Sequence, residues 1–286
     1  MNIALLVSVG ASEDLLDDYL RFHRAAGVDV VVLGGTSSSR SAALERHARD
    51  GFVRQVAGSP TPTDLARIAV DELGADWVVP TTLEELWWPR GESLQDVLAI
   101  IPPRYGVVQG LSREFVGTDE TSGSDGSPFV SRTVRTALLG PDGSGGASPE
   151  QLLRPIYRAG PNMSLDSQDW TLGGRRIPLR AWYPIEVFDY SVGVVDRERI
   201  DAGLADGSYV VDTRVRDVLA IDIPSFPVPS IVDDSAYAVE CAAVGEVDLV
   251  KLDRQIRELE SRIAALEARL WPTVRRTLRR IARRPG

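Results

Sequence analysis

The sequence predicts an α/β fold in which a mixed, mainly parallel sheet is flanked by helices on both faces. Short apolar runs of strand length alternate with amphipathic stretches of helix length over the first hundred residues. The runs at 3–8 and 28–33 are apolar throughout, which is typical of parallel strands buried on both faces. This alternating order predicts a doubly wound sheet with right-handed crossovers.

The boundaries of these elements follow from capping and stop residues. Ser12 caps the first helix, which ends at Gly27, and Ser93 caps the last one, which Pro102 and Pro103 halt. Between them we expect, in order, a helix near 41–50, a strand at 52–56, a helix at 63–73 and a strand at 76–80.

The second half of the chain is less regular. We expect strands at 105–116 and 129–139, separated by an acidic Gly/Ser loop at 118–128. Further structured segments are expected near 152–158, 178–190 and 208–222.

Composition limits the class of protein. The chain has 286 residues, 43% of them hydrophobic, which suits one large domain with an appendage. No apolar run approaches the roughly 20 residues that span a bilayer, and the N-terminal run reads as a strand rather than a signal peptide. The single Cys241 excludes an internal disulfide framework and predicts a cytoplasmic protein. Lys251 is the only lysine among 32 basic residues, which is typical of a GC-rich genome such as an actinobacterial one.

In a doubly wound sheet, ligands bind beyond the carboxyl ends of the strands. The turns at 8–12, 34–39 and 81–85 should therefore meet at one edge, and any chemistry is expected there.

One stretch resembles a known family. The run ADWVVPTTLEELWWPRGESLQDVLAIIPPRYGVVQG (75–110), together with 13–33, resembles a bacterial branch of the family 2 glycosyltransferases. The resemblance covers residues 2–115 and extends more weakly to about 200. It implies a GT-A fold over 1–240, a nucleotide-sugar donor, and Mg²⁺ or Mn²⁺ on the donor diphosphate.

Each of the family motifs that hold this donor is altered. The Arg–Asp/Asn–Glu triplet is replaced by residues 10–12, and the Asp–Asn…Ser…Asp turn by residues 34–39. The Asp–X–Asp–Glu motif reads as residues 82–85, which keep two carboxylates and lose the first. Two family histidines fall on Trp170 and Asp189. A divalent cation on a diphosphate needs several oxygen ligands, so these joint changes argue for lost or rewired donor chemistry.

The resemblance therefore implies two alternative readings of the site. In the favoured one the chain is a catalytically impaired homologue without a cofactor, acting as a partner or scaffold in cell-surface glycan assembly. In the other it is an active, metal-dependent transferase with Glu84 and Asp189 as metal ligands and Glu85 as the catalytic residue near the acceptor. The degenerate nucleotide-sugar cleft would be formed by Ser12, Gly34, Gly35, Ser37 and Thr82.

Other conspicuous side chains have simpler explanations. Adjacent aromatics after a strand pack under a sheet more often than they line an acceptor groove, so we expect Trp87 and Trp88 to be buried. His23 and His47 lie on predicted helices and are expected to be packed or surface residues rather than ligands.

The C-terminal segment predicts assembly. After a linker at 241–248, Leu and Ile recur at heptad spacing over 249–270, which favours a parallel coiled coil and thus a homodimer or hetero-oligomer. The alternative is a lone helix packed on the domain. The apolar positions are Leu249, Leu252, Ile256, Leu259, Ile263, Leu266 and Leu270.

The last segment, 271–286, is basic and amphipathic. It carries six arginines and no acid, with Trp271 on its apolar face, and suits an anionic membrane surface at the inner face of the plasma membrane. A solvated tail is the competing interpretation, and a membrane-tethering module is a further alternative for the whole protein. The remaining chain is acidic and would repel nucleic acid, so no nucleic-acid partner is expected.

Overall fold

The structure is a computed structural model. It describes, in order, residues 1–8, 15–35, 42–103, 105–118, 127–138, 152–160, 163, 165, 175–176, 183–191, 193–220, 226–227 and 237–242. The predictions for Ser12, Ser37, Trp170 and the segments 249–270 and 271–286 concern residues outside this part. Within it, no helix is long and apolar enough to cross a membrane.

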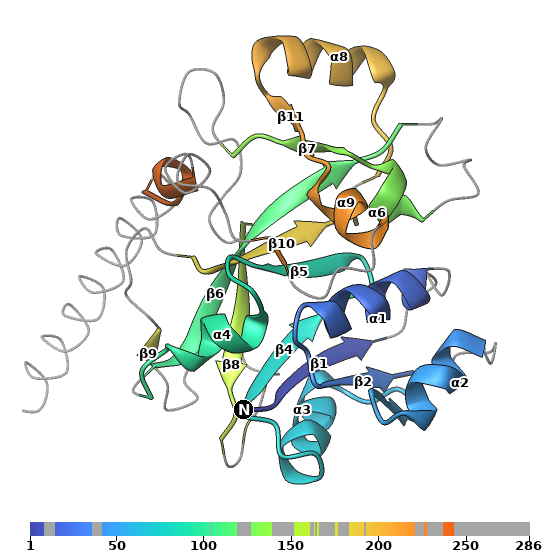
Figure 1. Cartoon of the computed structure of the whole chain (residues 1–286), viewed down its shortest axis with the longest axis vertical. Coiled ribbons are helices and arrows are strands. Elements are labelled where there is room, and N and C mark those ends of the chain that lie inside the picture. Colours follow the sequence, from blue (N-terminus) through green and yellow to red (C-terminus); the bar gives the residue numbers. More distant parts are fainter. Residues whose placement is uncertain are drawn as a thin grey trace, which may run out of the picture.

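The described strands form one mixed sheet (Figure 1). Its strands are β1 (Ile3–Ser8), β2 (Val30–Gly34), β3 (Val53–Val56), β4 (Trp77–Thr81), β5 (Glu85–Pro89), β6 (Tyr105–Val116), β7 (Val134–Thr136), β8 (Leu153–Arg158), β9 (Arg175–Arg176), β10 (Ile185–Asp189) and β11 (Tyr209–Val211). The helices are α1 (Leu16–Ala25), α2 (Ala42–Arg49), α3 (Pro62–Asp71), α4 (Leu94–Ala99), α6 (Pro128–Ser131), α8 (Arg197–Asp206) and α9 (Arg214–Ala220).

The N-terminal half confirms the predicted α/β fold. Strands β3, β2, β1 and β4 are parallel neighbours in this order. Alternate residues of β1 enter two separate cores, because side chains of a strand point to opposite faces of the sheet. Leu5 packs with Leu20 of α1 on one face, and Leu6 packs with Leu65 of α3 on the other. The architecture is therefore Rossmann-like, with helices covering both faces of a mainly parallel sheet.

Outside the parallel strands the structure departs from the prediction. The expected strand at 129–139 is wrong at its start, because Pro128–Ser131 form helix α6 and only Val134–Thr136 form a strand. Proline at the first helical position favours such a helix start. Strand β5 was not expected at all; it pairs antiparallel with β10, which also runs parallel to β6.

Both tryptophans of β5 lie in the core, as predicted. Trp87 is 0% exposed and Trp88 is 2% exposed. The Trp88 ring stacks on Phe188 at 5.4 Å between centroids and meets Phe226 edge-on at 4.7 Å. The interpretation that these rings line an acceptor groove is therefore wrong, since solvent does not reach them.

His23 joins helix α1 to strand β5 as a buried, neutral side chain. Its Nδ1 lies 2.9 Å from the Tyr19 carbonyl oxygen, and the Trp87 backbone N–H donates to its Nε2 at 3.2 Å. The Nδ1–H tautomer satisfies both contacts. Burial lowers the pKa of His23 to about 3, since the charged form has no counter-charge there. His47 is also buried, with its Nε2 3.4 Å from Asp17.

The buried His23 should make the free energy of unfolding depend on pH. Its pKa is about 3 when folded and roughly 6.5 when unfolded. Below that unfolded value the unfolded chain takes up a proton that the folded chain does not. The free energy of unfolding should thus fall by up to about 1.4 kcal/mol per pH unit as pH drops below 6.5. Urea unfolding of the wild type and His23→Gln between pH 7 and 4.5 tests this. Equal pH slopes in both proteins would contradict it.

Candidate functional site

The carboxyl ends of three strands meet at one edge, as the sequence predicts. Ser8 of β1 pairs with Gly34 of β2, and Val7 pairs with Thr81 of β4. The predicted site residues in the described part lie at or directly after these strand ends. They are Gly34, Gly35, Thr82, Glu84 and Glu85.

Close packing around Gly34 leaves no room for a side chain. It is buried, and a Cβ atom there would lie 2.6 Å from Cγ of Pro60 and 3.0 Å from Cδ2 of Leu65. A side chain at this position would have to displace the start of helix α3, so an acidic residue has no room here. The next residue, Gly35, adopts a positive φ of 117° that favours glycine.

A tight turn connects β4 to β5, and the Glu85 side chain folds back over this turn. The Glu85 carboxylate accepts hydrogen bonds from the Thr81 hydroxyl at 3.1 Å and from the Thr82 backbone N–H at 3.3 Å. Thr82 is exposed, whereas Glu84 is half-buried and its carbonyl accepts from the Tyr190 N–H at 2.9 Å. The two carboxylates of the motif thus lie in different surroundings.

The sheet places Asp189 directly opposite Glu85. These two residues are register partners in the antiparallel β5–β10 pair. Oδ1 of Asp189 accepts from the Ser191 N–H at 2.9 Å, while Oδ2 points to another partner. Asp189 and Glu85 are 5% and 7% exposed, so two carboxylates share a largely buried place.

The partner of both carboxylates is Arg154 of β8. Its Nε donates to Oε1 of Glu85 at 2.7 Å, and its Nη2 donates to Oδ2 of Asp189 at 3.0 Å. Burial lowers the pKa of Arg154, but the hydrogen bond and charge of Glu85, together with Asp189, outweigh it and raise that pKa. Sequence reasoning missed this residue; its only signal is an arginine within the apolar run of 152–158.

This Arg154 bridge occupies the position where a cation would neutralise the two acids. A divalent ion would need both carboxylates and further oxygen ligands, and would have to displace the guanidinium. Among the described residues, no group of three or more His, Cys, Asp or Glu side chains could hold a metal ion. The donor set found here therefore does not fit a bound Mg²⁺ or Mn²⁺.

Core residues hold the turn from below. The Trp87 indole N–H donates to the Thr81 hydroxyl oxygen at 2.9 Å, and this hydroxyl donates to Glu85. Tyr19 packs under the same turn, and burial raises the pKa of its phenol well above the ordinary value. The position of Glu85 is thus fixed by the same side chains that build the core.

Comparison with known proteins gives only distant similarities. No protein-family model and no curated protein matches the chain. Among solved structures, S. aureus TarS 1–349 is 15% identical over 55% of this chain and 47% of that chain, with a TM-score of 0.30. A 4-diphosphocytidyl-2C-methyl-D-erythritol synthase is 17% identical over 56% and 75%, with a TM-score of 0.28. Campylobacter jejuni bifunctional IspDF is 12% identical over 67% and 50%, with a TM-score of 0.31. The chain spans about half the length of TarS 1–349, and similarity at this level says nothing about the site.

Replacing Arg154 by methionine tests the bridge. The variant Arg154→Met leaves Glu85 and Asp189 together without a cation between them. We expect a loss of about 3–5 kcal/mol in unfolding free energy at pH 7, because two buried charges of the same sign are left unpaired. Denaturant unfolding at pH 7 measures this. Arg67→Met, which removes an exposed pair with Asp64, is the control and should cost little. A variant as stable as the wild type at pH 7 would show that the bridge is unimportant.

Proposed function

We propose that this chain is a GT-A-like homologue of family 2 glycosyltransferases that has lost donor chemistry and acts as a partner or scaffold in cell-surface glycan assembly. The α/β fold with a polar site at the strand ends supports the frame of this proposal. The resemblance of residues 75–110 supports the family, and the altered motifs support the loss.

The observation that carries the proposal is the Arg154 bridge. Departure of a nucleoside diphosphate needs cationic stabilisation of the leaving group. In the described part of the strand ends, the Arg154 guanidinium is already paired with Glu85 and Asp189, and these three side chains sum to one net negative charge. A diphosphate approaching this place would meet repulsion rather than a counter-charge. We therefore expect no metal and no nucleotide-sugar as a cofactor.

The competing proposal is an active transferase with a rearranged site. It requires Glu84 and Asp189 to bind Mg²⁺ or Mn²⁺ and Glu85 to act near the acceptor. Asp189 would first have to leave Arg154, with which it forms a 3.0 Å ion pair. No contact in the described structure favours this arrangement over the bridge.

Calorimetry separates these two proposals. Titrating the full chain with a panel of nucleotide-sugars and Mn²⁺ should give no measurable heat of binding and no rise in melting temperature, because stabilisation requires occupancy of the native state. The variant Arg154→Met, which frees both carboxylates, should gain weak Mn²⁺ binding, whereas Arg67→Met should not. Micromolar, metal-dependent binding of a nucleotide-sugar by the wild type would refute the impaired-homologue proposal.

We further propose that the chain assembles through 249–270 and contacts an anionic membrane through 271–286. Seven apolar residues at unbroken heptad spacing are not buried by an isolated helix and need a second copy or another surface. A dimer would present the basic segment twice and strengthen membrane attachment through effective concentration.

Aspartate substitutions within the heptads test the assembly. Ile256→Asp combined with Ile263→Asp should convert the dimer to a monomer and weaken binding to anionic vesicles, while all six arginines of 271–286 remain. Analytical ultracentrifugation and vesicle co-sedimentation at low and high salt are the measurements. Surface charge is screened by salt, so vesicle binding of the wild type should weaken at high salt. Persistence of the dimer in the double variant would mean that the heptads pack elsewhere.

A further inference from the structure

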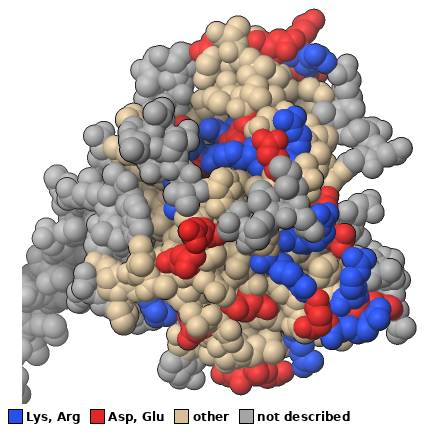
Figure 2. All heavy atoms as spheres, in the orientation of Figure 1, with Lys and Arg blue, Asp and Glu red and all other residues tan. Residues whose placement is uncertain are grey.

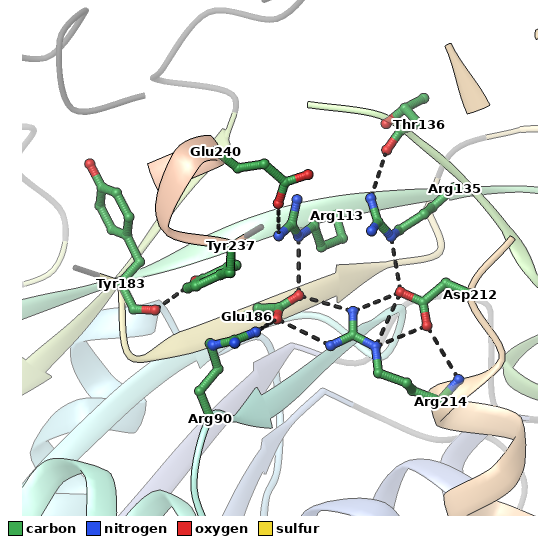
Figure 3. A network of polar contacts seen from close by, with 10 residues as sticks. All are labelled: Arg90, Arg113, Arg135, Thr136, Tyr183, Glu186, Asp212, Arg214, Tyr237 and Glu240. Atoms are coloured by element: carbon green, nitrogen blue, oxygen red, sulfur yellow. Dashed lines mark hydrogen bonds and ion pairs between the residues drawn. The ribbon is translucent and has the colours of Figure 1, made fainter. Parts of the chain in front are cut away.

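A second charged cluster joins β6, β7, β10 and α9 with Arg90, the residue that follows β5 (Figure 3). We call it the Glu186 network. It consists of Arg90, Arg113, Arg135, Glu186, Asp212, Arg214 and Glu240. Glu186 and Asp189 are three positions apart on β10 and therefore face opposite sides of the strand, so the network is separate from the Arg154 bridge.

Glu186 is the centre of this network. Its side chain is 1% exposed and accepts from Arg90 at 2.6 Å and from Nε of Arg113 at 3.1 Å. Arg214 binds the same carboxylate with both terminal nitrogens, each at 3.1 Å. Burial raises the pKa of Glu186, but the charges of Arg113, Arg214 and Arg90 outweigh it and hold the carboxyl ionised.

Asp212 connects a further arginine to the network. It accepts from Nε of Arg135 at 2.9 Å and from Nη2 of Arg214 at 2.7 Å. Burial lowers the pKa of Arg135, and the positive charge of Arg113 lowers it further. The two guanidinium groups are thus close enough to repel each other, and Figure 3 shows them side by side.

One donor of the network has no acceptor among the described residues. Nη1 of Arg113 is buried and makes no hydrogen bond in this part of the chain, and the whole side chain is only 2% exposed. The other nitrogens of this guanidinium are paired, Nε with Glu186 and Nη2 with Glu240. A buried charged donor without a partner is costly, so Nη1 points to an absent acceptor.

The Glu186 network borders the protein surface. The side chains of Arg214, Glu240 and Arg135 are 34%, 24% and 12% exposed, so the network is open on one side. Figure 2 shows basic and acidic side chains gathered at the surface in the upper half of the view, over this part of the sheet.

We propose that the Glu186 network binds an oxyanion, phosphate or carboxylate, between Arg113 and Arg135. Guanidinium groups match the geometry of such anions and bind them with paired hydrogen bonds. The Glu240 carboxylate cannot donate a hydrogen bond to an anion. It pairs with Nη2 of Arg113 at 2.6 Å, on the exposed side of the network. It therefore opposes anion binding while it stabilises the empty site. The anion would be a phosphate group or the carboxylate of an acidic sugar, and this site does not depend on the proposed function.

A purely structural network makes a different prediction for Glu240. Arg90 and Arg113 also stack on the Tyr237 ring, at 3.7 Å and 5.3 Å, and the Tyr237 hydroxyl donates to the Tyr183 carbonyl at 2.6 Å. Tyr237 and Glu240 belong to one short helical segment that closes the network. If the arginines only anchor this segment, removing the charge of Glu240 costs stability and creates no affinity.

The isosteric variant Glu240→Gln, which removes the negative charge of Glu240, is the test. The full chain and the variant Glu240→Gln are titrated by calorimetry with sodium phosphate and, separately, with sodium glucuronate, against sodium chloride at equal ionic strength. The amide oxygen still accepts from Arg113, so folding is retained. One fewer negative charge near the anion should tighten binding by about tenfold, whereas Arg135→Gln should weaken it by a similar factor. Glu72→Gln, an exposed residue on helix α3's C-terminal side, is the control for the change in net charge.

The outcomes identify the anion. If Glu240→Gln binds only phosphate more tightly than the wild type does, the site is assigned to a phosphate group. If it binds glucuronate more tightly as well, the site also accepts carboxylates. The six arginines of 271–286 bind anions equally in all variants, so only the difference between Glu240→Gln and Glu72→Gln reports the site. If these two variants bind both anions equally, the proposal is overturned, whatever the stability of Arg135→Gln.

Discussion

The pairing of β5 with β10 is the constraint on which the candidate site depends. It places Asp189 opposite Glu85 and so brings two carboxylates from distant parts of the chain into one buried place. Two such charges are mutually destabilising unless a cation separates them. Strand β8, antiparallel to β4 and β6, supplies that cation through Arg154. Because this cation is a side chain, the charges of Glu85 and Asp189 are compensated from within the chain.

The parallel half of the fold could be predicted from sequence because its signals are local. Apolar runs, caps and glycine stops each lie within one element, and β1 to β4 were found in this way. Strand β5 was missed because it pairs with a strand about a hundred residues later, and no local pattern shows this. The same holds for Arg154, whose role exists only after β8, β5 and β10 meet. Gly34 was predicted at the cleft, but its close contact with Pro60 depends on how helix α3 packs against the sheet, which no local pattern shows.

The two charged clusters of the described residues have opposite centres. At the strand ends one arginine lies between two carboxylates, whereas Glu186 is one carboxylate among three arginines. Burial strengthens both arrangements, because charges interact more strongly away from water. If the proposals made above hold, the strand ends repel an anion and the Glu186 network accepts one at Arg113.

The core and the candidate site are supported by the same side chains. Trp87 donates one hydrogen bond through its backbone to His23 and another through its indole to Thr81. Its burial stabilises the domain, and the same contacts hold the turn that carries Glu85. Substitutions at exposed positions such as Thr82 leave these contacts intact and cost little stability. Selection for stability alone would therefore retain Trp87, Thr81 and Glu85, whatever the chemistry of the site.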